Sequence, residues 1–140
     1  MPSRGWRGWV GPLAVTAIAA VLRLVDLGRP HAVVFDETYY IKDALALLRF
    51  GYEQGTIDAA DDVILSQHAA WDRLNVFTDS ASFVVHPPLG KWVIASGEWL
   101  VGVTPFGWRI GVAILGTLTV LMTARIMRRL TRSDVIGTVA

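Results

Sequence analysis

The sequence predicts an all-α integral membrane protein with two transmembrane helices and a large outer loop that contains juxtamembrane helices. Hydrophobic residues make up 53% of the 140 residues, a large share for so short a chain, which favours a membrane protein over a soluble one. Two apolar runs, about residues 9–27 and 109–127, lie near the ends of the chain. Arginines flank these runs, whereas residues 28–88 hold nine acidic and four basic residues. This charge distribution places both basic ends in the cytoplasm and the acidic segment outside.

The first apolar run, from Trp9 to Leu27, is close to the roughly 20 residues that a membrane-spanning helix needs. Arg23 and Asp26 lie near its outer end, one helical turn apart, where they can pair or reach the interface. A cleaved signal peptide, with a cleavage site at residues 17–19, is the alternative. Apolar sequence continues beyond that site, so we expect a transmembrane helix.

The outer loop, about residues 28–108, contains signals for short helices. Asp36 or Thr38 is a suitable N-cap for a helix that continues to about Phe50, and Gly51 is a suitable C-cap. We expect the apolar face of this helix to be formed by Tyr40, Ala44, Leu47 and Leu48. Beyond it we expect a polar connection, a second short helix, a turn and an extended stretch, at Glu53–Asp62, Val63–Asp72, Asp79–Ser82 and Phe83–Val85 respectively.

Two apolar stretches follow the loop. Leu89–Val103 spans only about 15 residues and contains Lys91 and Glu98, so it suits an interfacial or re-entrant helix better than a transmembrane one. Ile110–Ala124 is uncharged and, with its flanking residues, is long enough to span. Two spans, rather than three, keep both arginine-rich ends of the chain on the cytoplasmic side.

Asp36 and Glu37 are adjacent carboxylates at the start of the first loop helix. Neighbouring side chains diverge, so one carboxylate can face a reaction centre while the other contacts a structural partner. A carboxylate that is partly shielded from water has a raised pKa and becomes a better general base. The alternative is an acidic first turn that only interacts favourably with the helix dipole.

A proline-started turn, His86-Pro87-Pro88-Leu89-Gly90-Lys91, precedes the interfacial stretch. Pro88 suits the first position of a helix, whose free N–H groups together with Lys91 would attract an anion such as a phosphate. The alternative is a rigid turn that sets the direction of the helix. Arg23 and Arg109, at the outer ends of the two spans, would hold an anionic ligand, pair internally or extend to the interface.

Other chemistries find little support. Cysteine is absent, so there is neither a disulfide framework nor thiolate chemistry. His31, His68 and His86 match no metal-ligand spacing, and no nucleophile elbow supports Ser-His-Asp hydrolysis. Basic residues form no concentrated face outside the membrane flanks, so a nucleic-acid partner is not expected. We expect neither a cofactor nor a metal.

Four motifs, taken in their order along the chain, closely resemble the N-terminal part of protein O-mannosyltransferases, especially the actinobacterial kind that depends on polyprenyl-phosphate-mannose. These enzymes belong to the GT-C group of integral-membrane glycosyltransferases. Each motif is short, but their joint order is specific and covers essentially the whole chain. The motifs are Leu22-Arg23-Leu24, the stretch from Val34 to Ala44, the stretch from His86 to Trp92, and the stretch from Pro105 to Arg109.

The resemblance implies an inverting transfer of mannose from polyprenyl-phosphate-mannose to Ser or Thr hydroxyls of exported proteins, without a catalytic metal. It implies that Asp36 is the catalytic base, with Glu37 its neighbour, and that Arg23 and Arg109 lie near the lipid phosphate. His86 and Lys91 then belong to the segment beneath that site. We expect a multi-pass protein of the cell membrane with an extracytoplasmic catalytic loop, in contact with membrane lipids and associated with the translocon.

Family members run to several hundred residues with many more spans, so we interpret the chain as an N-terminal fragment or truncated product that is inactive alone. Two other functions stay open. One is a related GT-C transferase that moves another lipid-linked sugar, such as aminoarabinose. The other is a non-catalytic two-span membrane protein that binds a lipid phosphate or a partner transferase.

Overall fold

The computed structural model describes residues 5–67 and 70–140, except for the side chain of residue 7. Arg4, the side chain of Arg7, and His68 therefore lie outside the described part of the chain. The chain divides into two compact units, which are described separately. The first comprises residues 1–26 and 113–140, and the second comprises Leu27–Val112.

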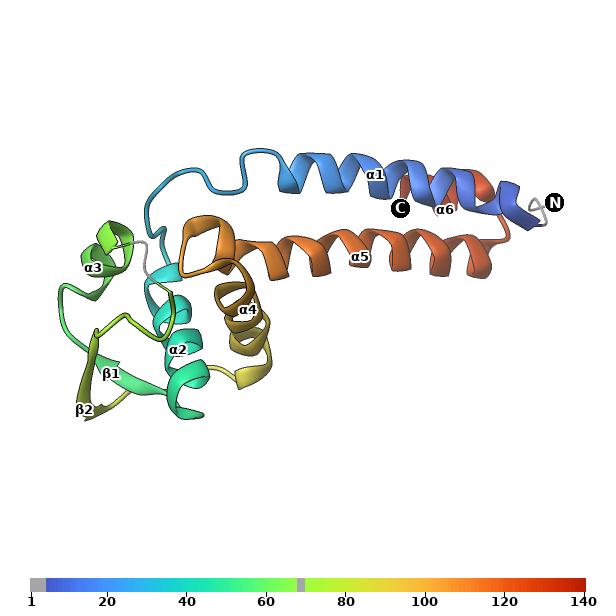
Figure 1. Ribbon diagram of the computed structural model, residues 1–140. Helices are drawn as coiled ribbons and strands as arrows, with labels where there is room; N and C mark the ends of the chain where they lie inside the picture. The colour runs from blue at the N-terminus through green and yellow to red at the C-terminus, as the bar shows by residue number, and fades with distance from the viewer. Residues whose placement is uncertain (1–4, 68–69) are drawn as a thin grey trace. The chain divides into compact units, whose positions relative to one another are not determined.

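The first unit contains a short 3₁₀ helix η1 (Gly5–Trp9), helix α1 (Val10–Leu24), most of helix α5 (Pro105–Thr131) and helix α6 (Asp134–Val139) (Figure 1). Helices α1 and α6 pack closely, since a Cβ on Gly11 would lie 2.1 Å from Thr138 Oγ1. Arg125 donates a hydrogen bond to the carbonyl of Gly8 (3.0 Å), and its guanidinium lies 3.7 Å from the centre of the Trp9 ring.

Helix α5 is, within the described residues, the one helix long and apolar enough to cross a membrane. Helix α1 is shorter than expected. Its 15 residues are about 22 Å long at 1.5 Å per residue, whereas the hydrocarbon core measures about 30 Å. It ends because Val25 is extended and Asp26 adopts a left-handed conformation (φ 54°), so the apolar run to Leu27 does not continue as helix. The first span therefore stays a prediction.

The second unit is built on helices α2 (Glu37–Phe50) and α4 (Pro88–Val101), which pack against each other (Figure 1). As predicted, Asp36 occupies the N-cap position of α2, Gly51 ends it in a left-handed conformation (φ 79°), and Pro88 begins α4. The predicted apolar face of α2 was partly wrong. Ala44 and Leu47 are buried, but Tyr40 and Leu48 are only half-buried, and Ile41 and Leu45 join the core instead.

The rest of this unit departs from an all-α loop. Strands β1 (Gln54–Thr56) and β2 (Phe77–Ala81) form a two-stranded antiparallel sheet, where we expected a polar connection and a turn. Helix α3 (Ala60–Gln67) lies between them in the chain and begins three residues before the expected Val63. These elements and the start of α5 complete the hydrophobic core, whose buried members are Ile41, Leu45, Ala60, Ile64, Leu74, Val76, Val103 and Trp108.

Helix α4 has an unusual distribution of polar residues. Lys91 and Glu98, which argued against a transmembrane helix, are both buried inside the unit, whereas Leu89, Trp92 and Trp99 are exposed. Neither carboxylate oxygen of Glu98 has a hydrogen-bond partner among the described residues, and burial raises the pKa of this carboxyl well above its usual value. An apolar outer face with tryptophans is what an interfacial helix needs.

Candidate active site

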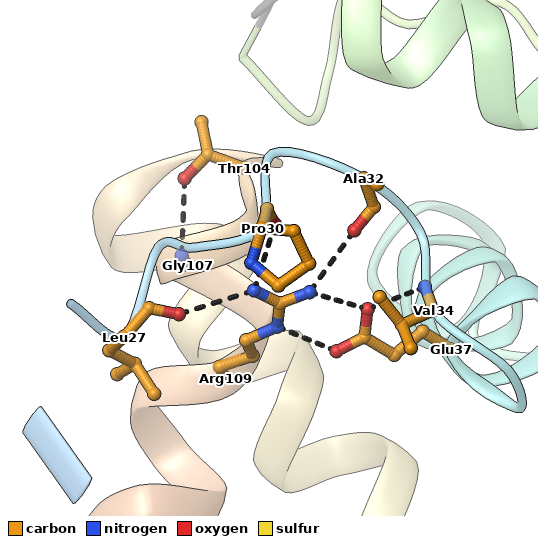
Figure 2. A network of polar contacts seen from close by, with 8 residues as sticks. All are labelled: Leu27, Pro30, Ala32, Val34, Glu37, Thr104, Gly107 and Arg109. Atoms are coloured by element: carbon orange, nitrogen blue, oxygen red, sulfur yellow. Dashed lines mark hydrogen bonds and ion pairs between the residues drawn. The ribbon is translucent and has the colours of Figure 1, made fainter. Parts of the chain in front are cut away.

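Arg109 uses all of its hydrogen-bond donors within the second unit (Figure 2). Its Nε lies 2.6 Å from Glu37 Oε1 and its Nη2 lies 2.8 Å from Glu37 Oε2, a bidentate ion pair. Its other N–H groups donate to the carbonyls of Leu27 (3.2 Å), Pro30 (3.1 Å) and Ala32 (3.1 Å). A guanidinium has five N–H groups, so none is left for a further anion in this arrangement.

Glu37 is held equally firmly. Besides the two bonds from Arg109, its Oε2 accepts the backbone N–H of Val34 at 3.0 Å (Figure 2). Burial alone would raise the pKa of Glu37, but the hydrogen bonds from Arg109 and Val34 and the charge of Arg109 outweigh it, so the pKa is lowered. Glu37 is thus an ionised carboxylate with both oxygens occupied.

Asp36 is the opposite case. It is exposed at the N-cap of α2, and its carboxylate makes no capping hydrogen bond. Nor does the carboxylate make any other hydrogen bond or ion pair with the residues that the structure describes. It lines a cleft in the second unit, whereas Glu37 does not. Of the two adjacent carboxylates, Asp36 is the one that is free to react.

This cleft has a volume of about 540 Å³ and lies among α2, the two strands and the segment that leads into α4. Besides Asp36, it contains two more of the six predicted site residues, His86 and Lys91. The full set of lining residues is Asp36, Tyr39, Tyr40, Lys42, Asp43, Gln54, Gly55, Thr56, Ala81, Ser82, Phe83, Val85, His86 and Lys91.

His86 is paired with Tyr40 in the cleft. The Tyr40 hydroxyl lies 3.2 Å from His86 Nδ1, and the two ring centroids are 5.5 Å apart. Tyr40 lies one helical turn after Asp36, so this pair and the free carboxylate belong to the same side of α2. Two aromatic rings and a carboxylate are groups that bind sugar or alcohol hydroxyls.

Lys91 is not available for a phosphate in this arrangement. Its Nζ lies 2.9 Å from Asp43 Oδ2 and 2.6 Å from Glu53 Oε1, with the side chain only 2% exposed. Ser82 donates a further hydrogen bond to Asp43 Oδ1 at 3.2 Å. Burial alone would lower the pKa of Lys91, but the hydrogen bonds that it donates to Glu53 and Asp43, together with their negative charges, outweigh it, so the pKa is raised. This buried triad ties α2, α4 and the segment before β1 together at the cleft.

Arg23 belongs to the other unit. Its Nη1 donates to the carbonyl of Ala19 (3.4 Å), and the side chain lines a separate cavity of about 390 Å³ with residues such as Gly116 and Thr119. The structure therefore brings Asp36, His86 and Lys91 together in the cleft and places Arg23 in another cavity. Within the described residues there is no group of three or more His, Asp or Glu residues that could hold a metal.

Asp43, Glu53 and Tyr40 were not predicted as site residues. Asp36, Tyr40 and Asp43 follow one another at intervals of four and three residues, the spacing of one helix face, and this was a usable signal. Lys91 inside an apolar helix also implied a buried carboxylate partner. Nothing in the local sequence indicated which of the acidic loop residues would be that partner.

The second unit thus offers a cleft with one free carboxylate, in a mostly helical chain with a helix that can cross a membrane. Compared with known proteins, the chain is similar to polyprenol-phosphate-mannose–protein mannosyltransferases. It is 54% identical to the enzyme of this name from Corynebacterium glutamicum over 135 residues, and the match covers 90% of this chain. It is 34% identical over 137 residues to that of Mycolicibacterium smegmatis and 33% to that of Mycobacterium tuberculosis, in both cases 96% of this chain.

The chain resembles a segment of these protein mannosyltransferases over nearly its whole length, as the four motifs indicated. It spans 22% of the length of each of these relatives, so most of such an enzyme lies outside this segment. No protein-family model matches the chain, and no solved structure matches it significantly.

Proposed function

We propose that this segment carries the catalytic carboxylate of a transferase that moves mannose from polyprenyl-phosphate-mannose to Ser or Thr hydroxyls of exported proteins. The observation that carries the proposal is the division of roles between the adjacent acids. Asp36 lines the cleft without a partner, whereas Glu37 has both oxygens bound. A general base needs an accessible, unoccupied oxygen, and among the two only Asp36 has one.

In the proposed reaction, Asp36 accepts the proton of the acceptor hydroxyl. The hydroxyl oxygen forms a bond to C1 of mannose, while the bond from C1 to the phosphate oxygen breaks and polyprenyl phosphate leaves with the electron pair. No protein nucleophile intervenes, so the configuration at C1 is inverted in one step, as in inverting glycosidases. His86 and Tyr40 are placed to contact the hydroxyls that enter the cleft.

Glu37 and Arg109 act as positioning residues in this proposal. Arg109 donates hydrogen bonds to the carbonyls of Leu27, Pro30 and Ala32 and also binds Glu37. It therefore holds the backbone before Asp36 and the residue after it in place. A direct contact of Arg109 or Lys91 with the lipid phosphate stays a prediction, and it would require each to leave its present carboxylate partners. Arg23 makes one weak hydrogen bond, to a backbone carbonyl, so it would break fewer contacts than Arg109 or Lys91 on binding a phosphate.

We also propose a GT-C architecture in which α1 and α5 span the cell membrane and residues 28–108 face outwards, with α4 lying along the surface. The basic ends of the chain and the exposed apolar face of α4 support this topology. An outward-facing cleft can meet exported polypeptides, and association with the translocon would deliver them before they fold.

The activity is tested with membranes that contain the full-length transferase carrying this segment, or a chimera in which it replaces the matched segment of the C. glutamicum relative. Radiolabelled polyprenyl-phosphate-mannose should label a Ser/Thr-containing acceptor peptide in these membranes. Labelling of lipid rather than peptide, or use of lipid-linked aminoarabinose instead, would support the related sugar transferase. Absence of transfer with correct membrane insertion would support the non-catalytic alternative.

A further inference from the structure

The cleft contains two lysines, and both are neutralised. Lys42 Nζ lies 3.1 Å from Asp61 Oδ1 and donates to the Thr38 hydroxyl at 3.1 Å. Lys91 is bound by Asp43 and Glu53 in the buried triad. With Asp36 added, there are four carboxylates and two ammonium groups in and around the cleft; Asp36 and Asp43 line it, whereas Asp61 and Glu53 contact the lysines from outside its lining. Neither ammonium group is left unpaired to hold an anion, and the free charge in the cleft is the carboxylate of Asp36, which is the reverse of what a phosphate site requires.

The buried side-chain atoms in and beside the cleft that have no partner among the described residues are hydrogen-bond acceptors. Gln54 donates through Nε2 to the carbonyl of Thr78 at 2.6 Å, which fixes the orientation of its amide. Its Oε1 is buried and, among the described residues, has no hydrogen-bond partner, and the same holds for Glu53 Oε2 behind the cleft. Asp36 adds a free, exposed carboxylate. Such a site favours a ligand that brings N–H, O–H or ammonium donors.

Resting on the function proposed above, we infer that the cleft is the binding site for the acceptor polypeptide and that it selects against acidic residues beside the acceptor Ser or Thr. Mannose also brings hydroxyl donors, but a neutral sugar gives no reason for an excess of carboxylates. A polypeptide brings both N–H donors and charged side chains. The exposed side chains of Phe83 and Val85, in the extended segment that lines the cleft, offer apolar contacts to such a chain. The lipid phosphate then binds outside this cleft.

The selectivity is tested with three peptides that share one Thr acceptor and differ only in the flanking residues, which are Glu, Gln or Lys. The full-length transferase should use the Glu peptide with a kcat/KM about three- to tenfold below that of the Lys peptide, with Gln between them. The difference should shrink at high salt, because exposed charges are screened. KM for polyprenyl-phosphate-mannose should be the same with all three.

Ala81→Lys locates the effect in the cleft. Ala81 is exposed and lines the cleft. An ammonium there should raise kcat/KM for the Glu peptide and so narrow the difference in kcat/KM between the Glu and Lys peptides. The matched control is Asp72→Asn, which makes the same change in charge at an exposed residue that does not line the cleft and should leave the difference intact.

Equal use of the three peptides, preference for the Glu peptide, or an equal response to both substitutions would overturn the inference. In each of these cases transfer that depends on Asp36 would persist, and the proposed function would stand. If no peptide is mannosylated, or if transfer does not depend on Asp36, it is the proposed function itself that fails.

Discussion

Glu37 and Arg109, 72 positions apart in the sequence, form a bidentate ion pair beside the candidate base, with N–O distances of 2.6 and 2.8 Å. The pair joins the first turn of α2 to the first turns of α5. Arg109 also donates hydrogen bonds to three backbone carbonyls in the segment before α2, those of Leu27, Pro30 and Ala32 (Figure 2). The immediate surroundings of Asp36 therefore depend on a single guanidinium.

Arg109→Ala should lower the stability of the second unit by roughly 1.5–3 kcal/mol or more, since charge-assisted hydrogen bonds to a partly buried carboxylate are lost. Arg109→Lys should rescue little, because an ammonium cannot reproduce a bidentate contact together with three carbonyl bonds. Thermal unfolding of the purified full-length enzyme measures the change, with Arg73→Ala as an exposed control. A variant with normal stability and only a raised KM for the lipid donor would instead make Arg109 a phosphate ligand.

Glu37 gives stability a pH dependence of known sign. Its pKa is lower in the folded chain than the ordinary 4.5, so its contribution is fully present above pH 4.5 and is lost as pH falls through the lowered folded value. We expect the melting temperature to decrease with acidification below pH 4.5. Glu37→Gln should flatten this part of the profile, while the exposed control Asp72→Asn should not. Parallel profiles for wild type and Glu37→Gln would contradict the assignment.

Lys91 should behave as a structural cation. Lys91→Met leaves Asp43 and Glu53 buried without a counter-charge, at a cost of roughly 3–5 kcal/mol. Adding Asp43→Asn and Glu53→Gln should recover much of that loss, because neutral amides are cheaper to bury. Unfolding of the single and triple variants measures this. A Lys91→Met enzyme of normal stability that binds the lipid donor poorly would restore the phosphate role predicted from the sequence.

Elements whose ends carry local sequence signals could be predicted, whereas elements that depend on pairing with a distant segment could not. Helices α2 and α4 could be predicted because their ends carry their own capping residues, Gly51 and Pro88. Strands β1 and β2 could not be predicted, because they pair with each other across the intervening α3. The sequence of each strand alone is typical of a polar connection or a turn. Irregular pairing, with a register shift between Gln54 and Thr56, further weakens any alternating pattern.

The same distinction holds for the site. Asp36 and Glu37 could be found as a pair, because they are adjacent and precede a helix. Which of them would be free could not be predicted, since it depends on Arg109 reaching Glu37 from a helix far along the chain. Lys91 was assigned to a phosphate because its sequence neighbours form a helix N-terminus. Its two carboxylate partners come from α2 and from the segment before β1, where they resemble ordinary solvated acids.

The topology is testable because the chain contains no cysteine. Asp62→Cys, in the proposed outer loop, should react with a membrane-impermeant thiol reagent applied to intact cells. Thr131→Cys, at the end of α5, should react only after the membrane is opened, because the arginines around it are expected to face the cytoplasm. Labelling of both positions from outside, or the reverse pattern, would refute the two-span arrangement and with it an outward-facing cleft.

Asp36→Asn should nearly abolish mannosyl transfer while expression, stability and lipid-donor binding are retained. The amide keeps the size of the side chain but cannot accept a proton, and loss of a general base typically lowers the rate by about 10²–10⁴. Because the Asp36 carboxylate has no described partner, the substitution should leave the melting temperature unchanged, unlike Glu37→Gln, which breaks the ion pair with Arg109. Asp79→Asn, at an exposed residue outside the cleft, is the matched control and should have normal kcat. Single-turnover transfer from radiolabelled polyprenyl-phosphate-mannose separates the chemical step from donor binding. If Asp36→Asn turns over normally while Glu37→Gln is inactive at unchanged stability, the base is Glu37, and its bond to Arg109 must open during the reaction.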